Sequence, residues 1–183
     1  MRHLIPLFLL FVGISFNVYA LDSKPQSIEF QPEKKGGIIS FDFDGLILKK
    51  EAAIDISHES NDSLIQFLYK VISINKTGDK KQIISLWKAE ERGRIEVMVN
   101  QPEMLNHNTS LFKNMKHSKL LGYIEYGDYI VCFVEHDLQG VGAYRKIYPL
   151  TRERGQYVQT NGLSNDFLFS QVFYGLGEYL WAK

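Results

Sequence analysis

Apolar and polar positions between residues 118 and 160 follow the pattern of antiparallel strands joined by short turns. Four strands are predicted there, over residues 120–126, 129–136, 143–150 and 156–160. The turns between them carry glycine and aspartate, which suit tight reversals of the chain. In the second strand every position from Tyr129 to Val134 is apolar, so apolar side chains point to both faces of the sheet. We therefore expect this strand to be central and covered on both sides.

A smaller β-pattern precedes this sheet. Strands are predicted over residues 27–30, 37–43, 46–49 and 53–57. The dipeptide Asp44-Gly45 is typical of a turn, and we expect one between the second and third of these strands. Alternation points Phe41 and Phe43 inward, which leaves Asp42 and Asp44 on the outward face.

Helical spacing appears between the two β-patterns. Over residues 63–75 the apolar residues recur at i, i+3, i+4, i+7 and i+8, which predicts a helix with one buried face. Asn61 or Asp62 can cap its start, and Gly78 ends it. Beyond it, Asp79 can cap a second helix with an apolar stripe of Ile83, Ile84 and Trp87. Shorter helical pieces are predicted over residues 95–99 and 111–115.

The segment after the sheet is rich in aromatic residues. Asn165 or Asp166 can cap it, and it ends at Trp181. Gly175 and Gly177 weaken it as a helix. It is one of three candidates to cover the second face of the sheet, the others being the β-element before residue 58 and a second copy of the chain. We favour the β-element, because it is too small to bury its own apolar residues alone.

The order of the elements, strands first, then helices, then a long meander, predicts an α+β domain with helices on one face of a curved antiparallel sheet. Four features resemble the NTF2-like (cystatin-like) α+β cone over about residues 62–160: the helix over residues 63–75, the break Lys76-Thr77-Gly78-Asp79, the segment Leu86-Trp87-Lys88 and the strand end Gly155-Gln156-Tyr157. That fold hosts small enzymes, ligand-binding pockets and interaction modules, so the resemblance does not fix a function. Its enzymes place an Asp-His pair in the cone, and we match no such pair here.

The first twenty residues have the pattern of a secretory signal peptide. A short start with Arg2 precedes an apolar run and the small-residue ending Val18-Tyr19-Ala20, so cleavage is expected after Ala20. An uncleaved anchoring helix is the alternative, although the apolar run is short for a bilayer span. We therefore expect a periplasmic or secreted protein without a stable membrane anchor.

Cleavage would leave residues 21–183 as a single α+β domain, with a β-element over residues 21–57 and the NTF2-like part over residues 58–183. Removing Arg2 leaves 20 basic and 21 acidic side chains, a balance that favours neither nucleic acid nor an anionic membrane as a partner. The single cysteine, Cys132, lies within a predicted strand. It is interpreted as a small buried hydrophobe, and the alternative is a reactive thiol.

One motif suggests an enzyme. The apolar stretch that leads to Asp42-Phe43-Asp44-Gly45 resembles the first motif of haloacid-dehalogenase-like phosphatases, in which the two aspartates bind Mg²⁺ and act as nucleophile and general acid. The residue after the glycine is Leu46 instead of the usual Thr or Val, and no later segment supplies the family's lysine and paired aspartates. The alternating βα units of a parallel sheet are also missing from the pattern. The alternative is an ordinary strand with two solvent-facing acids.

Other candidates are weaker. The histidines His58, His107, His117 and His136 are scattered without metal-ligand spacing and are interpreted as surface or turn residues, so no metal site is predicted. His136-Asp137 is the one adjacent pair. Glu125 and Glu135 lie on neighbouring predicted strands and could converge as acid and base, or face water at strand edges.

These patterns lead to a hypothesis of an exported binding or accessory protein without catalytic activity, cofactor or metal. It would use a cone-shaped apolar cavity or a sheet face to bind a small apolar ligand or a protein partner, and a homodimer is left open. A small NTF2-like enzyme acting on an apolar molecule is the second hypothesis, and a phosphatase using Asp42 and Asp44 is the third. No catalytic or ligand-binding residue is assigned from the sequence.

Overall fold

A computed structural model of the chain describes residues 21, 23–31 and 37–182. In this part of the chain seven strands form one antiparallel sheet: β1 (Lys24–Phe30), β2 (Ile39–Ile47), β3 (Ile54–Asp55), β4 (Met115–Tyr126), β5 (Tyr129–Leu138), β6 (Gly142–Glu153) and β7 (Gln156–Gln159). Their order is β1-β2-β4-β5-β6-β7, and β3 pairs with β4 beside β2. The predicted signal peptide, residues 1–20, lies outside the described residues.

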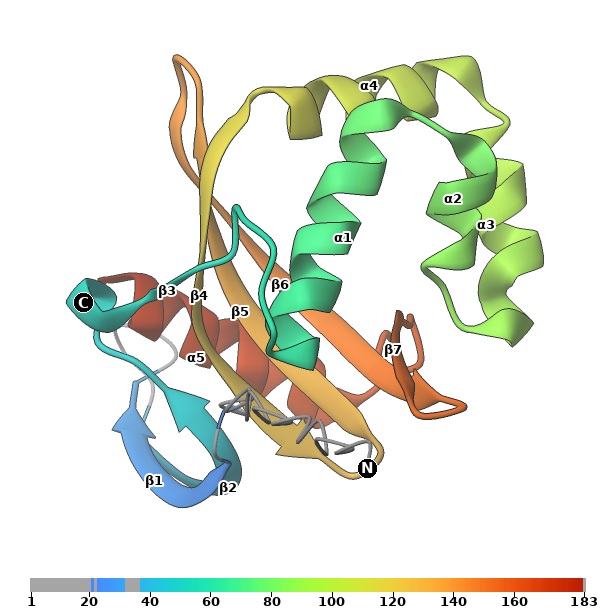
Figure 1. The fold of residues 1–183 in the computed structure, drawn as a ribbon. Helices are drawn as coiled ribbons and strands as arrows, with labels where there is room; N and C mark the ends of the chain where they lie inside the picture. Colours follow the sequence, from blue (N-terminus) through green and yellow to red (C-terminus); the bar gives the residue numbers. More distant parts are fainter. Residues whose placement is uncertain (1–20, 22, 32–36, 183) are drawn as a thin grey trace, which may run out of the picture.

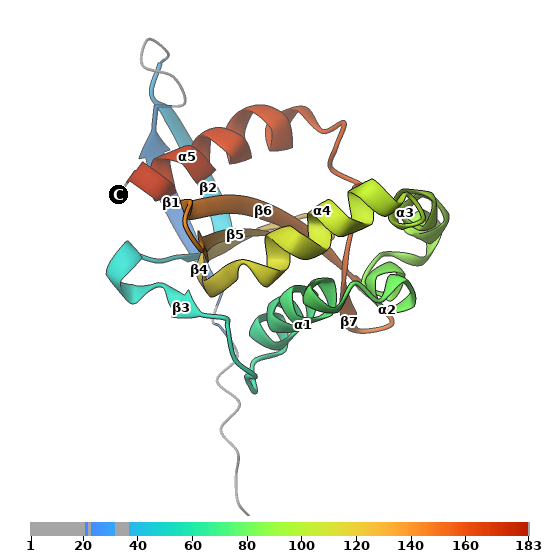
Figure 2. The ribbon, with the colours of Figure 1, turned by 90° about the horizontal axis from the view of Figure 1, so that it is seen from above.

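The same part of the chain holds five α-helices: α1 (Ser63–Thr77), α2 (Lys80–Ser85), α3 (Arg92–Val99), α4 (Pro102–Lys113) and α5 (Tyr174–Ala182). A π-helical segment, Phe169–Phe173, leads directly into α5. Helices α1 to α4 lie on one face of the curved sheet and α5 lies on the other, so the protein has three layers (Figures 1 and 2). The predicted α+β class and curved antiparallel sheet are confirmed.

The centre of the sheet is β5, as the sequence predicts. Cys132 and Val134 are fully buried in the core beneath α1, and Val131 and Phe133 are fully buried in a second core beneath α5. Each of the four predicted strands of the meander is present, and the first three are longer than predicted. Apolar residues on both faces of one strand therefore did indicate two covering layers.

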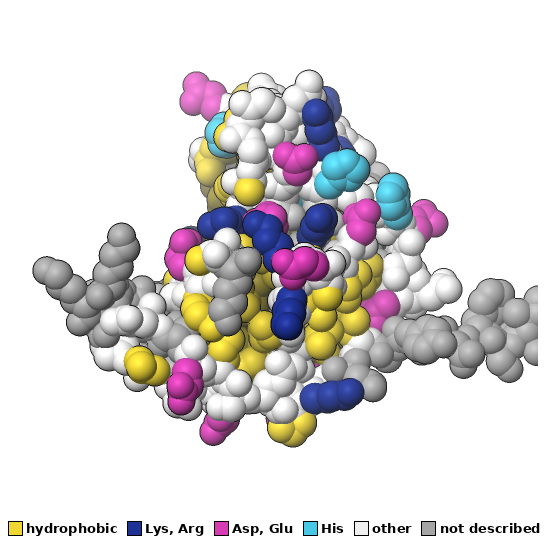
Figure 3. Space-filling model, turned by 90° about the vertical axis from the view of Figure 1, so that its left-hand side faces the viewer, with side chains coloured by type: hydrophobic (Ala, Val, Ile, Leu, Met, Phe, Trp, Pro, Cys, Tyr) yellow, Lys and Arg dark blue, Asp and Glu magenta, His cyan; other side chains and the backbone are white. Residues whose placement is uncertain are grey.

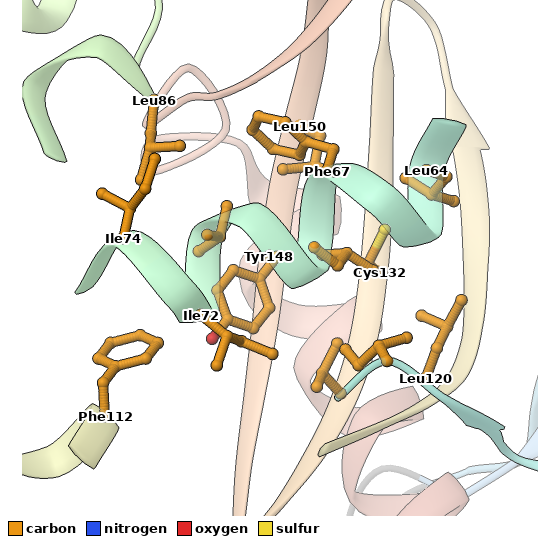
Figure 4. Close-up of a cluster of buried hydrophobic side chains, with 14 of the residues drawn as sticks. Leu64, Phe67, Ile72, Ile74, Leu86, Phe112, Leu120, Cys132, Tyr148 and Leu150 are labelled. Atoms are coloured by element: carbon orange, nitrogen blue, oxygen red, sulfur yellow. The ribbon is translucent and has the colours of Figure 1, made fainter. Parts of the chain in front are cut away.

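Helix α1 has a stabilising residue at each end and an apolar face that packs on the sheet. The Asp62 carboxylate accepts hydrogen bonds from the backbone N–H groups of Leu64 and Ile65, both at 2.9 Å. At the other end, Gly78 has a φ of 72°, a left-handed conformation that glycine adopts without strain. Figure 4 shows the apolar side chains of α1 pointing toward those of β4, β5 and β6. This core holds most of the buried residues on the helical side of the sheet.

The second predicted helix is shorter than expected. Asp79 caps α2, but the helix ends at Ser85, and Trp87 is not part of its stripe. The chain instead runs beside β7, where the Gln159 N–H donates to the Leu86 carbonyl at 2.8 Å and the Lys88 N–H donates to the Gln159 carbonyl at 2.9 Å. Pairing with the sheet edge satisfies the backbone groups that a longer helix would have paired internally.

The predicted turn at Asp44-Gly45 is wrong, because β2 continues through both residues. Gly45 allows β2 to approach β4 closely: a Cβ at this position would collide with the Tyr123 carbonyl oxygen. Gly122 of β4 plays the same role toward the Leu46 carbonyl oxygen. The glycine therefore marks close contact between strands and not a reversal of the chain.

The favoured cover of the second face is also wrong. The N-terminal β-element extends the sheet at its edge as β1 and β2, and α5 with its preceding π-helical segment lies across the second face. That layer contributes Phe169, Phe173 and Leu176 to the second core. A Cβ on Gly177 would lie 3.1 Å from the Trp181 ring, closer than ordinary packing, so this glycine leaves room for that ring in α5. Close packing here outweighs the weak helix propensity of glycine.

Candidate functional site

An apolar cavity lies on the helical side of the described structure. It has a volume of about 460 Å³ and lies between α2, α3, α4 and the floor formed by β6 and β7. Its walls are mostly hydrophobic and include Ile83, Trp87, Ile95, Val99, Leu111 and Phe112. Volumes of this size and apolar walls are typical of small-molecule sites.

Several contacts hold the segment between α2 and α3 against one edge of the sheet. Besides the pairing of residues 86–88 with β7, the Glu91 carboxylate accepts hydrogen bonds from the Thr160 hydroxyl at 2.5 Å and from the Asn161 backbone N–H at 2.8 Å. Arg92 forms an ion pair with Glu153 of β6 at 3.2 Å. These contacts hold the start of α3 at the sheet. Residues of α3 and α4 line the cavity above its floor. Figure 1 shows these two helices beside α2, on the same side of the sheet as α1.

Lys146 is the charged residue on the cavity floor. It lies on β6 opposite Val134, whose side chain is in the core beneath α1, so Lys146 also faces the helices. Its Nζ lies 4.8 Å from the centre of the Tyr148 ring and 5.6 Å from that of Phe112, which also lines the cavity. Within residues 21, 23–31 and 37–182, none of the ion pairs includes Lys146. Burial lowers the pKa of this lysine.

Amide side chains add polar groups to the wall. Asn75 of α1 and Asn108 of α4 both line the cavity, and the Asn108 amide nitrogen donates to the Asn75 amide oxygen at 2.7 Å. Gln159 lines it from β7. Glu103 and His107 of α4 are exposed residues that also border the cavity. The site therefore combines one lysine and several amides with a mostly apolar surface.

A buried polar network lies beside the cavity floor. The His136 Nδ1 is 2.7 Å from the Ser118 hydroxyl, and its Nε2 is 2.9 Å from the Tyr148 hydroxyl. Burial, followed by the positive charges of Lys146 and Lys76, lowers the pKa of His136 from 6.5 to about 3. The ring is therefore neutral near pH 7, and a neutral imidazole donates one of its two hydrogen bonds and accepts the other.

The prediction of His136 as a surface or turn residue is wrong, because this side chain is fully buried. Strand β5 continues to Leu138, so residue 136 follows Cys132 and Val134 toward the helices. Its neighbour Asp137 is exposed and belongs to the opposite face, so the adjacent pair does not act together. Cys132 and Val134 point to the helical face, and the next alternate residue of the strand is His136. This spacing was the signal in the sequence that His136 is buried.

The other histidines agree with the prediction. His58, His107 and His117 are exposed. His58 lies 3.9 Å from the Asp55 carboxylate, and the residues that the structure describes contain no group of three or more His, Cys, Asp or Glu side chains that could hold a metal ion. His107 nevertheless borders the cavity, which its position in the sequence did not indicate.

Glu125 and Glu135 do not converge. Glu125 pairs with Ile130 and faces the helices α1 to α4, whereas Glu135 pairs with Lys119 and belongs to the face that α5 covers. The Glu135 carboxylate lies 3.6 Å from Arg145 and 3.7 Å from Lys50. It balances two positive charges at the edge of the α5 layer and has no partner acid.

The strand with Asp42 and Asp44 has the outward acids that alternation predicts. Both side chains are exposed, while Phe43 between them is buried in the second core. They lie near the edge of an antiparallel sheet, and not at the carboxyl end of a central parallel strand as in the phosphatases that the motif resembles. The placement of these aspartates does not support phosphoryl transfer.

Cys132 is a buried hydrophobe in the described structure. Its side chain is fully buried, and burial raises the pKa of the thiol, which disfavours the reactive thiolate.

Charged side chains of both signs are interspersed on the side of the molecule that Figure 3 shows, in agreement with the formal net charge of zero. In the described part of the chain, none of the helices is long and apolar enough to cross a membrane.

Sequence reasoning missed Lys146 as a site residue. Its place on β6, between Tyr144 and Tyr148 on one face, could have indicated a lysine that points inward. The cavity above it could not be anticipated, because it depends on how short helices stand relative to the sheet. No family model matches the chain, and neither a curated protein nor a solved structure matches it. The NTF2-like resemblance therefore stays a prediction.

Proposed function

We propose that the protein is an exported binding protein that holds a small apolar molecule in the cavity between α2, α3, α4 and β6. The observation that carries this proposal is the cavity itself, with a volume of about 460 Å³ and mostly hydrophobic walls. Pockets for small molecules have this combination of volume and mostly apolar walls. The apolar lining, more than the volume, is what favours an apolar occupant.

The rim supports entry of a ligand from solvent. Met98 of α3 and Met104 of α4 line the cavity and are 39% and 42% exposed. Methionine is flexible and tolerates partners of different shape, so it suits the entrance of a site for apolar molecules. The entrance is therefore expected between α3 and α4.

Binding is favoured over catalysis because the imidazole and two of the amide side chains near the cavity already have hydrogen-bond partners within the protein. Asn75 and Asn108 form one such pair, and His136 is enclosed between Ser118 and Tyr148. A general acid or base must reach a bound molecule, and His136 reaches only its two hydroxyl partners. The arrangement suits a wall that holds a ligand in place.

Export is the part of the proposal that rests on the first twenty residues. Their pattern predicts cleavage after Ala20 and a mature chain that begins at Leu21. Mass spectrometry of the protein recovered from the periplasm or the medium should give the mass of residues 21–183. Recovery of the intact chain beginning at Met1 would contradict export by cleavage and would leave the binding proposal to be judged separately.

The binding proposal is tested with N-phenylnaphthylamine, a neutral apolar dye whose fluorescence rises in apolar surroundings. We expect saturable binding of one dye per chain, and Met98→Trp should weaken it about tenfold by narrowing the cavity. Val97→Trp is the matched control, because Val97 precedes Met98 on the same helix but is 64% exposed and does not line the cavity. Absence of saturable binding, or equal loss in both variants, would contradict the proposal.

A further inference from the structure

The lysine on the cavity floor lacks a negative partner. Its Nζ faces two aromatic rings, those of Tyr148 and Phe112, and within residues 21, 23–31 and 37–182 none of the ion pairs includes it. A ring face attracts a cation weakly compared with a carboxylate at hydrogen-bond distance. An ammonium group in a largely apolar cavity is therefore poorly compensated in the free protein.

Acidic side chains of the protein are placed where they do not compensate Lys146. Glu103 borders the cavity from the exposed side of α4 and forms no ion pair with Lys146. The carboxylate of Glu91 is occupied by Thr160 and Asn161, and that of Glu153 by Arg92. An anion that enters the cavity would supply the missing negative charge and favour the charged form of Lys146.

We infer that the cavity takes an amphipathic molecule with one anionic head group, such as a carboxylate on an alkyl chain, with the head at Lys146 and the apolar part against α3 and α4. This inference rests on the proposed binding function and names the chemical class of the ligand. A single lysine matches a single negative charge, because a polyanion such as a nucleotide would need several cations. The amide of Gln159, which lines the same floor, can donate a further hydrogen bond to the head group.

The direction of the ligand follows from the two ends of the cavity. Lys146 belongs to β6 of the sheet, whereas the exposed Met98 and Met104 belong to α3 and α4. The head group therefore lies at the floor and the apolar chain extends toward the entrance. In this orientation the anion lies in the apolar cavity, away from water. Its attraction to the ammonium group is stronger there than it would be in water.

The test is displacement of N-phenylnaphthylamine by three probes with the same alkyl chain: decanoate, decanol and decylamine. We expect decanoate to displace the dye at a concentration about tenfold lower than decanol, as one hydrogen bond to a charged group would give. Decylamine should be the weakest of the three. In Lys146→Met the preference for decanoate over decanol should disappear while decanol and the dye still bind.

Two further variants keep the result interpretable. Lys146→Gln removes the charge but keeps a polar side chain, and it should lose the same preference even if Lys146→Met folds poorly. Lys113→Met is the matched control, because Lys113 is an exposed lysine at the end of α4 that does not line the cavity. It should leave the preference unchanged.

The outcomes separate this inference from the proposed function. Equal displacement by decanoate and decanol in the unchanged protein would overturn the inference and leave the binding function standing, as would a preference that survives in both Lys146 variants. Failure of the dye to bind at all would overturn the proposed function, and the inference with it. A preference lost in both Lys146 variants and kept in Lys113→Met would establish the ligand class.

Discussion

The two faces of the sheet are covered in different ways. On one face, α5 lies flat, and Phe173 contacts the rings of Phe41, Tyr126 and Phe169 with centroid distances of 5.6, 5.2 and 6.1 Å. On the other face, α1 packs as closely, but α2, α3 and α4 leave a cavity with a lysine on its floor. A filled aromatic layer contributes stability, whereas an incompletely filled layer with an uncompensated charge gives up stability and provides room for a ligand.

This contrast predicts the largest loss of stability on the α5 face. Phe173→Ala removes a fully buried ring from the centre of the second core and should lower the free energy of unfolding by about 3–5 kcal/mol. Phe167→Ala, in the same segment but at a residue that is 74% exposed, should change it by less than about 1 kcal/mol. Urea denaturation of both variants measures the difference, and similar losses would mean that α5 does not form a closed core.

Acid should weaken the helical face through His136. The folded protein holds the pKa of this histidine at about 3, below its ordinary value of 6.5, so the unfolded chain binds a proton first as the pH falls. The stability is complete above pH 6.5 and decreases toward pH 3, by about 2 kcal/mol from this group between pH 6.5 and pH 5.

The measurement is urea denaturation at pH 7 and pH 5. His136→Gln should lose this part of the pH dependence, although it is less stable overall. His58→Gln, which changes an exposed histidine, should keep it. A difference between the two pH values that is the same in the unchanged protein and in His136→Gln would show that His136 does not titrate in this way.

Substitution of the cavity lysine should change the free energy of unfolding in the opposite direction to substitution of Phe173. Lys146→Met replaces an uncompensated ammonium group with an apolar side chain of similar length, and it should raise the free energy of unfolding by about 1 kcal/mol in the absence of ligand. The same variant is expected to lose the preference for decanoate over decanol. A clear loss of stability in Lys146→Met would indicate that the lysine is a structural residue, held by Tyr148 and Phe112.

The smallest effect is expected at the outward face of β2. Asp42→Asn changes an exposed carboxylate at the edge of the sheet and should alter the free energy of unfolding by less than about 0.5 kcal/mol. Dye binding should be unchanged. Magnesium-dependent phosphatase activity that disappears with this substitution would restore the enzyme hypothesis based on Asp42 and Asp44.

Local patterns predicted the long elements that carry their own signals, whereas α4 was expected only as a short piece over residues 111–115. The alternating apolar positions of β5 indicated two buried faces, and the caps at Asp62 and Gly78 marked both ends of α1. They failed where the role of a residue depends on what packs against it. Gly45 resembles a turn residue but serves a close approach of β2 to β4, and Gly177 resembles a helix breaker but leaves room for the Trp181 ring.

The candidate site was less predictable for the same reason. Alternation places Lys146 on the helical face, but nothing in the sequence says that the helices above it leave a space. That space depends on the pairing of residues 86–88 with β7, which ends α2 early and holds α3 away from the floor. A cavity forms between several elements, so the spacing of residues within one element does not predict it.

The most direct test of the difference between the two faces is to map decanoate binding by chemical-shift changes of the backbone amides. Saturable shifts should appear in α3, α4 and β6 around Lys146, and those of α5 should be unaffected. Shifts that instead gather on the α5 layer, around the exposed residues Phe167 and Leu168 before the π-helical segment and Tyr174 of α5, would contradict the assignment of the ligand site to the helical face, as would the absence of saturable shifts.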